Sequence, residues 1–188
     1  AWFMFRMFGV NEVAILDGGL HKWFTEGRPI EQGKVTLRHR HFTVWRDPAA
    51  VRDLEQMKAN VATGAEEVVD ARSAKRFTGE EADPRGLAAG HIPGSKNLPY
   101  DRLLNEDGTF RGRDEIRAAF DEAGVDPSKP LVTTCGSGVT AAVVSFAAAL
   151  LGREDIALYD GSWSEWGLRP DTEKEIGAGC KTTTTATA

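Results

Sequence analysis

The sequence predicts an α/β domain built on a mainly parallel sheet flanked by helices. Short apolar segments that are typical of buried strands alternate with segments that have helical patterns. The expected strands are residues 67–70, 130–134 and 156–159, and the expected helices that separate them include residues 114–123 and 140–151. Strands that alternate with helices favour parallel pairing, because each helix carries the chain back to the start of the next strand.

Each expected helix has its own signals. Asp47 followed by Pro48 is typical of an N-cap and a first helical position, so a helix is expected from there to about Ala62. Residues 114–123 place their apolar side chains on one face and are followed by a glycine, which commonly ends a helix. Residues 140–151 are almost wholly apolar, which predicts a buried helix.

An internal repeat relates the start of the chain to its later part. When each residue is aligned with the one 143 positions on, as Phe3 is with Phe146, the two segments match without a gap. The other matched residues are Gly9 and Gly152, Ala14 and Ala157, Asp17-Gly18 and Asp160-Gly161, and Trp23 and Trp166. We therefore expect residues 1–30 to be the C-terminal end of a non-catalytic domain of the same kind, whose bulk is missing from this sequence.

Composition indicates the remaining boundaries. Residues 31–41 carry scattered charge without a sustained period and are expected to be a linker. The catalytic domain is expected to span residues 42–172, and the small and polar residues 173–188 to be a disordered tail. The apolar side chains near the start, Phe5 among them, lack most of the partners of a full domain, so we expect exposed apolar surface there.

The composition also excludes several classes of function. The formal net charge of −5 argues against a nucleic-acid partner. No apolar run approaches the roughly 18 residues needed to span a bilayer, so no membrane partner is expected. The two cysteines, Cys135 and Cys180, are too few for a disulfide framework, and no histidine has zinc-ligand spacing to them. A reducing compartment is therefore expected, and with it a cytoplasmic location.

The loop after the expected strand at 130–134 carries the chemistry. Cys135 opens this loop at the carboxyl end of the strand, where ligands bind in such folds. Gly136 and Gly138 let the backbone curl so that several N–H groups point inward, and the following helix adds the partial positive charge of its N-terminus. Ser137 and Thr140 add hydroxyl groups. This anion cradle should stabilise a thiolate, which can attack sulfane sulfur and hold it as a persulfide.

Other roles for the cysteine are less well supported. A cysteine phosphatase needs an arginine six residues after the cysteine to hold phosphate, and Ala141 occupies that position. A Cys–His hydrolase needs a base near the thiol, and His91, the candidate within this domain, lies in a Gly-His-Ile-Pro-Gly segment that indicates a structural turn. A purely structural thiol is disfavoured by its place between a strand and a glycine-rich loop.

Several motifs together resemble those of the two-domain rhodanese-like sulfurtransferases. They are Val69-Asp70-Ala71-Arg72, Arg76-Phe77, Gly90-His91-Ile92-Pro93-Gly94, Asn97-Leu98-Pro99, the loop from Cys135 to Thr140, and Tyr159-Asp160-Gly161-Ser162-Trp163. The resemblance implies a rhodanese-like domain preceded by the C-terminal remnant of a second one. It also implies sulfur transfer through a persulfide on Cys135 to a thiol acceptor such as thioredoxin, or to cyanide, without a metal or organic cofactor.

The loop also separates two sulfur donors within that family. Members that use thiosulfate resemble Cys-Arg-Lys-Gly-Val-Thr, in which two cations suit a dianion, whereas this loop reads Cys-Gly-Ser-Gly-Val-Thr and is neutral. The resemblance therefore implies 3-mercaptopyruvate as the donor, with pyruvate released. It implies that Arg76 and Arg85 hold the donor carboxylate, since a guanidinium can form two parallel hydrogen bonds with it. The other substrate-binding residues that it implies are Gly136, Gly138, Val139 and Thr140.

The resemblance gives Ser137 a catalytic role beside Cys135. In the family the matching serine is oriented by a histidine and an aspartate of the first domain, which would lie outside this sequence, so transfer by this chain is expected to be impaired. Arg72 is expected to be structural and paired with Asp70. A thiosulfate sulfurtransferase and a non-catalytic persulfide carrier remain as alternative hypotheses.

Overall fold

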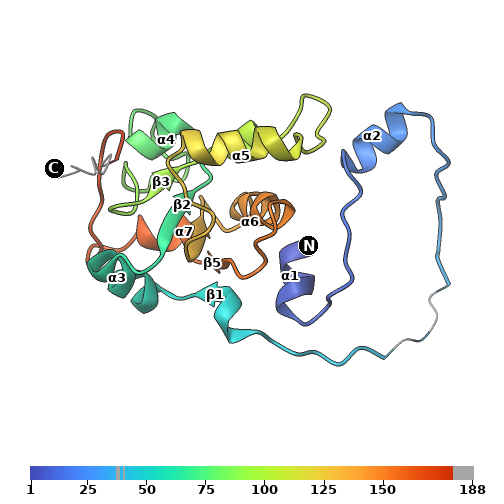
Figure 1. The fold of residues 1–188 in the computed structure, drawn as a ribbon, viewed down its shortest axis with the longest axis horizontal. Helices are drawn as coiled ribbons and strands as arrows, with labels where there is room; N and C mark the ends of the chain where they lie inside the picture. The colour runs from blue at the N-terminus through green and yellow to red at the C-terminus, as the bar shows by residue number, and fades with distance from the viewer. Residues whose placement is uncertain (37–38, 40, 180–188) are drawn as a thin grey trace, which may run out of the picture.

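The computed structural model describes residues 1–36, 39 and 41–179 (Figure 1). In chain order its elements are α1 (Trp2–Met7), α2 (Gly19–Thr25), the 3-10 helix η1 (Pro48–Ala50), β1 (Val51–Arg52), α3 (Leu54–Thr63), β2 (Glu67–Asp70), α4 (Ala74–Thr78), β3 (Lys96–Asn97), the 3-10 helix η2 (Tyr100–Leu103), α5 (Arg113–Glu122), β4 (Leu131–Thr134), α6 (Ala141–Leu150), β5 (Ala157–Tyr159) and α7 (Ser162–Trp166).

The described strands form one five-stranded sheet in the order β1-β5-β4-β2-β3, and every neighbouring pair is parallel. The three predicted strands are confirmed as β2, β4 and β5. Strands β1 and β3 at the two edges have two residues each, too short for a sequence pattern to reveal. In the central pair Asp70 is level with Thr134, so the carboxyl ends of β2 and β4 meet at one edge of the sheet.

The core lies on both faces of the sheet, because alternate strand residues point to opposite layers. Val69 and Leu131 pack in one cluster with residues of α5 and α6. Their neighbours Val68 and Val132 pack in the other cluster with residues of α3 and α7. Each fully buried side chain of this size contributes about 1.5–3 kcal/mol. The α/β architecture with flanking helices is thus the one that the sequence predicts.

One predicted helix begins later than expected. Asp47 does cap a helical turn, since its Oδ1 accepts a hydrogen bond of 2.8 Å from the backbone N–H of Ala49, but that turn is only the 3-10 helix η1. The chain then pairs with β5 as the edge strand β1. Helix α3 starts after Asp53, whose side chain forms a capping box with Gln56. Strand pairing therefore interrupts the helix predicted from Asp47.

Helix α1 packs on α6. The rings of Trp2 and Phe146 meet edge to face with centroids 5.0 Å apart, and Arg6 forms an ion pair with Glu154. Helix α6 therefore has the sheet on one side and α1 on another, in agreement with its apolar sequence.

The sequence repeat has a counterpart in the backbone. Helix α1 ends at Met7 and α6 at Leu150, while α2 begins at Gly19 and α7 at Ser162, so both pairs of bounds have the same spacing as the repeat. Gly19 and Ser162 also share a positive φ, of 61° and 50°. The assignment of residues 1–30 to the end of a second domain stays a prediction.

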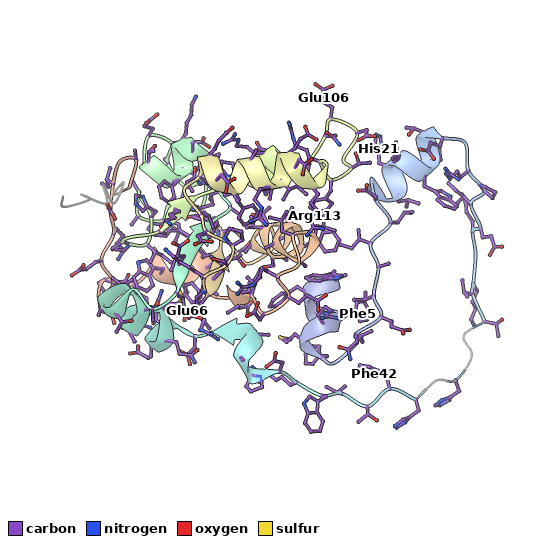
Figure 2. All side chains as sticks on the ribbon, viewed as in Figure 1. Phe5, His21, Phe42, Glu66, Glu106 and Arg113 are labelled. Carbon is purple, nitrogen blue, oxygen red and sulfur yellow. The ribbon has the colours of Figure 1, made fainter. Side chains whose placement is uncertain are left out.

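Apolar surface is exposed on α1, as predicted. Met4 and Phe5 are 57% and 51% exposed. Figure 2 shows Phe5 on α1 and Phe42 on the segment that leads to η1, and both line an apolar groove of about 330 Å³.

The linker and the C-terminal segment differ in whether they contact the domain. Residues 28–36 and 41–46 are exposed and lack helix or strand, and Figure 1 shows them in a long arc from α2 to η1. Residues 173–179, by contrast, are held against the domain, since His91 and Glu175 form an antiparallel bridge. The predicted disordered tail is therefore wrong for residues 173–179, because backbone pairing holds a segment whose composition is merely polar. Residues 180–188, Cys180 included, lie outside the described residues.

Candidate active site

Cys135 follows β4 and lies at the carboxyl edge of the sheet. Its side chain is almost fully buried, with 2% of the residue exposed. The backbone around it is tied to α7: Trp163 N–H donates to the carbonyl of Cys135 at 2.9 Å, and Ser164 N–H donates to the carbonyl of Gly136 at 3.0 Å. A loop that could otherwise move is thus fixed to a helix of the core.

The loop turns one backbone N–H toward the thiol. The N–H of Ser137 donates to Sγ of Cys135 at 3.4 Å, which is one contact of the several that the predicted cradle would make. Gly138 has φ of 79°, and a Cβ on it would lie 3.2 Å from Oδ1 of Asp160 and 3.3 Å from its carbonyl oxygen. A side chain at position 138 would therefore disturb the loop.

A cleft of about 440 Å³ opens at Cys135. It is lined by loop residues Cys135, Gly136, Ser137, Val139 and Thr140, and by facing residues Ala71, Arg72, Ser73, Arg76, Pro84, Arg85, Pro99, Tyr100 and Asp101. The structure thus brings together all the predicted site residues except one. Gly138 lines the neighbouring groove of about 520 Å³, which lies between the loop and α1.

Arg85 reaches across the cleft to the cysteine loop. Its Nη1 donates to the carbonyl of Gly136 at 2.9 Å and also contacts Oγ of Ser164. Its Nε and Nη2 form the two-pronged pair with Asp83, at 2.9 and 2.8 Å. Asp83 raises the pKa of the Arg85 guanidinium, and Cys135 adds to this effect. Arg85 is therefore a fixed cation beside the thiol.

Arg76 lies on α4 and joins the same carboxylate. Its Nη2 donates to Oδ2 of Asp83 at 2.6 Å. Its Nε is buried and has no hydrogen-bond partner among the described residues. Its Nη1 makes no hydrogen bond to a described residue, so Nη1 is the donor that Arg76 keeps for a ligand in the cleft.

Two polar residues near the site that sequence reasoning missed are Asp83 and Ser162. Asp83 holds both arginines, and the Asp-Pro-Arg order was the available signal, since an aspartate often binds the backbone two residues on. Ser162 is the one non-glycine residue with positive φ among those described. Its Oγ donates to the carbonyl of Tyr159 at 2.8 Å and accepts from the N–H of Cys135 at 3.3 Å, which anchors the start of the loop.

Arg72 and His91 have structural settings, as predicted. Arg72 is buried, pairs with Asp70 through Nη2 and Oδ2 at 2.7 Å, and lies over the ring of Trp163 at 4.5 Å. His91 is fully buried, stacks on Phe77 and bonds its carbonyl oxygen at 2.8 Å. These contacts fix both side chains in place, although Nε2 of His91 is buried and has no hydrogen-bond partner among the described residues.

The fold and site define an α/β protein with a buried cysteine at the junction of a parallel strand, a glycine-rich loop and a helix. A family model described as the rhodanese-like domain matches residues 53–169. The chain therefore belongs to the rhodanese-like domain family.

Curated relatives of the chain are sulfurtransferases. It is 44% identical to the 3-mercaptopyruvate sulfurtransferase of Homo sapiens over 95% of this chain and 60% of that protein. It is 45% identical to the thiosulfate sulfurtransferase of Gallus gallus over 94% of this chain and 61% of that protein. The chain thus spans about three fifths of the length of these relatives.

Solved structures agree with the fold. SseA of Escherichia coli, a 3-mercaptopyruvate sulfotransferase, superposes with a TM-score of 0.75 at 41% identity, over 87% of this chain and 61% of that chain. Tum1 of Saccharomyces cerevisiae gives a TM-score of 0.79 at 30% identity, over 94% of this chain and 64% of that chain. Among the described helices, none has the length and apolar character that crossing a membrane demands.

Proposed function

We propose that this chain acts in sulfur transfer from 3-mercaptopyruvate, through a persulfide on Cys135, to a thiol acceptor or to cyanide, with release of pyruvate. The observation that carries the proposal is the cleft in which Arg76 and Arg85 lie beside a buried thiol on a neutral loop. A carboxylate on the arginines would bring the sulfur of a short mercapto acid to Cys135.

The first half of the reaction forms the persulfide. The Cys135 thiolate attacks the sulfur of the donor, an S–S bond forms, and the donor C–S bond breaks with its electron pair moving to carbon. The leaving group is the enolate of pyruvate, which takes one proton to give pyruvate. Backbone N–H groups of the loop and the hydroxyl of Ser137 are the groups that would stabilise the developing negative charge.

The second half of the reaction returns the enzyme to its thiolate. An acceptor thiolate attacks the outer sulfur of the persulfide, and the S–S bond electrons return to Cys135. The outer sulfur would stand about 2 Å from Sγ, and we expect it to point into the cleft that Cys135 lines, where an acceptor can reach it. A thiol such as that of thioredoxin, or cyanide, is the acceptor we propose, in the cytoplasm.

Two alternatives remain. Thiosulfate as donor is favoured by the relative from Gallus gallus, and disfavoured by the absence of Arg and Lys after Cys135. The other alternative is a persulfide carrier that accepts sulfur and does not turn over.

Pyruvate release from 3-mercaptopyruvate tests the proposal. Cys135→Ser should abolish release, and Arg76→Ala should raise KM at least about tenfold, because a hydrogen bond to a charged group is worth about 1.5–3 kcal/mol. Lys75→Ala is the matched control, since Lys75 is an exposed cation on the same helix and does not line the cleft. A chain that accepts sulfur and releases no pyruvate would favour the carrier, and faster transfer from thiosulfate would refute the donor assignment.

Mass spectrometry tests the intermediate separately. After exposure to donor, the peptide with Cys135 should gain one sulfur atom that a reducing thiol removes, while the peptide with Cys180 stays unchanged. An unmodified Cys135 peptide would contradict the persulfide.

A further inference from the structure

A single carboxylate, Asp83, joins the two arginines of the cleft. It accepts from Nη2 of Arg76 at 2.6 Å, and from Nε and Nη2 of Arg85 at 2.9 and 2.8 Å. Its Oδ1 also accepts from the backbone N–H of Arg85 at 2.9 Å. Asp83 itself is 7% exposed. Both of its oxygens are therefore fully used within the protein, and the carboxylate fixes how both guanidinium groups are oriented.

The orientation matters because both guanidinium groups lie over the cysteine loop. A Cβ on Gly136 would be 3.2 Å from Nη2 of Arg85 and 3.6 Å from Nη2 of Arg76. Arg85 is also tied to the loop itself through the carbonyl of Gly136. A contact made at Asp83 thus sets the distance between two cations and the residue next to the thiol.

The same carboxylate sets the charge of the cleft. Arg85, and after it Arg76, holds the pKa of Asp83 well below its usual range, so the side chain is ionised at neutral pH. Two guanidinium groups and one carboxylate leave this cluster with one net positive charge, and the loop after Cys135 adds none. Of the other charged residues that line the cleft, Arg72 is paired with Asp70, and Asp101 carries a negative charge. One net charge matches a donor with a single carboxylate, whereas a dianion would keep an unmatched negative charge in a half-buried cleft.

We infer that Asp83 is a positioning and specificity-determining residue, which holds Arg76 and Arg85 over Gly136 and limits them to one net positive charge, so that the cleft prefers a monocarboxylate to a dianion. The inference deepens the proposed function and rests on its donor cleft. Arg76 then supplies the free donor through Nη1, since only its Nη2 donates to a described residue and its Nε is buried, while Arg85 is mainly committed to Asp83 and the loop.

Anion binding to Cys135→Ser protein, in which no sulfur can be transferred, tests the inference. Calorimetry would give the dissociation constants of pyruvate, a monoanion, and thiosulfate, a dianion. Asp83→Asn should shift the ratio of the two constants about tenfold toward thiosulfate, since one freed positive charge at a few ångströms acts on two negative charges instead of one. If the role of Asp83 were merely structural, Asp83→Asn would weaken the binding of both anions by the same factor.

Two further variants separate charge from position. Asp83→Glu keeps the charge and moves the oxygens, so both affinities should fall while their ratio stays within about twofold. Glu81→Gln removes an exposed carboxylate of the same segment that does not line the cleft, and should leave both constants within about twofold.

The outcomes distinguish this inference from the proposed function. An unchanged ratio in Asp83→Asn, an equal shift in Glu81→Gln, or a parent protein that binds neither anion would overturn the role of Asp83. A shifted ratio in a chain that releases no pyruvate would leave the role of Asp83 standing and reject the proposed turnover. Pyruvate release together with an unchanged ratio would uphold the proposed turnover and reject the role of Asp83.

Discussion

Helices α1 and α2 and helices α6 and α7 follow the same pattern at the spacing of the repeat, yet the later copy is embedded in the domain and the earlier one lies on its surface. Trp166 is 1% exposed in the core, whereas its counterpart Trp23 is half-buried. Both indoles donate to a carbonyl of the segment that follows, Trp23 to Pro29 at 2.9 Å and Trp166 to Glu173 at 2.7 Å. Local sequence therefore suffices for the helix and the indole hydrogen bond, while burial comes from the surrounding domain.

The largest expected effect contrasts the two tryptophans. Trp166→Ala should lower the free energy of unfolding by about 3–5 kcal/mol, because it empties a fully packed site. Trp23→Ala should lower it by less than about 1 kcal/mol, because α2 has no buried residues. Urea unfolding followed by circular dichroism measures both, and Trp166→Phe serves if the alanine variant does not fold. Equal costs would show that the earlier copy contributes to the same cooperative core.

The second effect contrasts the residues that begin α7 and α2. Ser162→Ala should cost about 2 kcal/mol, because the buried carbonyl of Tyr159 and the N–H of Cys135 lose their partner. Gly19→Ser places the same residue in the earlier copy, where nothing lies within 4 Å of its Cβ. The substitution should destabilise α2 alone, and it should change the free energy of global unfolding by less than about 0.5 kcal/mol. Thermal unfolding would contradict this contrast if Gly19→Ser proved the more damaging change.

The comparison also shows what sequence can predict. The three long strands, α5, α6 and the cysteine loop were predictable, because each carries its own apolar period or a glycine pattern. The edge strand β1 was not, because Val51 and Arg52 form it only through pairing with β5. Likewise the composition of residues 173–179 is that of a tail, and only the isolated bridge between His91 and Glu175 reveals otherwise.

The candidate site divides in the same way. The loop from Cys135 to Thr140 and the two arginines were identified from motifs, and the structure places them around one cleft apart from Gly138. Asp83 was missed, because its role depends on Arg76 of the preceding helix α4 folding back onto the loop that carries Asp83. Contacts between segments that are separate in sequence are the part that pattern reasoning does not reach.

A smaller effect should appear where the earlier copy meets the later one. Trp2→Ala removes the edge-to-face contact with Phe146, which is worth about 1 kcal/mol. The hydrogen-exchange rate of the α1 amides should rise about fivefold, while the rate of the α6 amides stays the same. Phe5→Ala is the matched control on the same helix, since Phe5 is half exposed and should change exchange little. Equal acceleration by both variants would mean that α1 is not held through Trp2.

The smallest effect concerns acid, and it should separate α2 from α7. Lys22 on α2 pairs with Asp107 at 2.8 Å and holds the pKa of Asp107 below its usual range. A carboxylate whose folded pKa is depressed stabilises a contact above its unfolded pKa and loses that effect as pH falls through the folded value. Helix α7 is held instead by Trp163, whose Nε1 donates to the carbonyl of Ala88 at 2.9 Å and does not titrate.

Acidification below the ordinary carboxyl range should therefore release α2 from the loop that carries Asp107 before α7 loosens. Hydrogen exchange at a series of pH values, corrected for intrinsic rates, would show the α2 amides opening first. Asp107→Asn should open α2 at neutral pH and weaken its response to acid, with α7 unaffected; the pair of Lys22 with Glu26 would remain. Release of both helices at one pH would instead assign α2 to the same acid-sensitive unit as the domain, and would remove the main difference between the two copies.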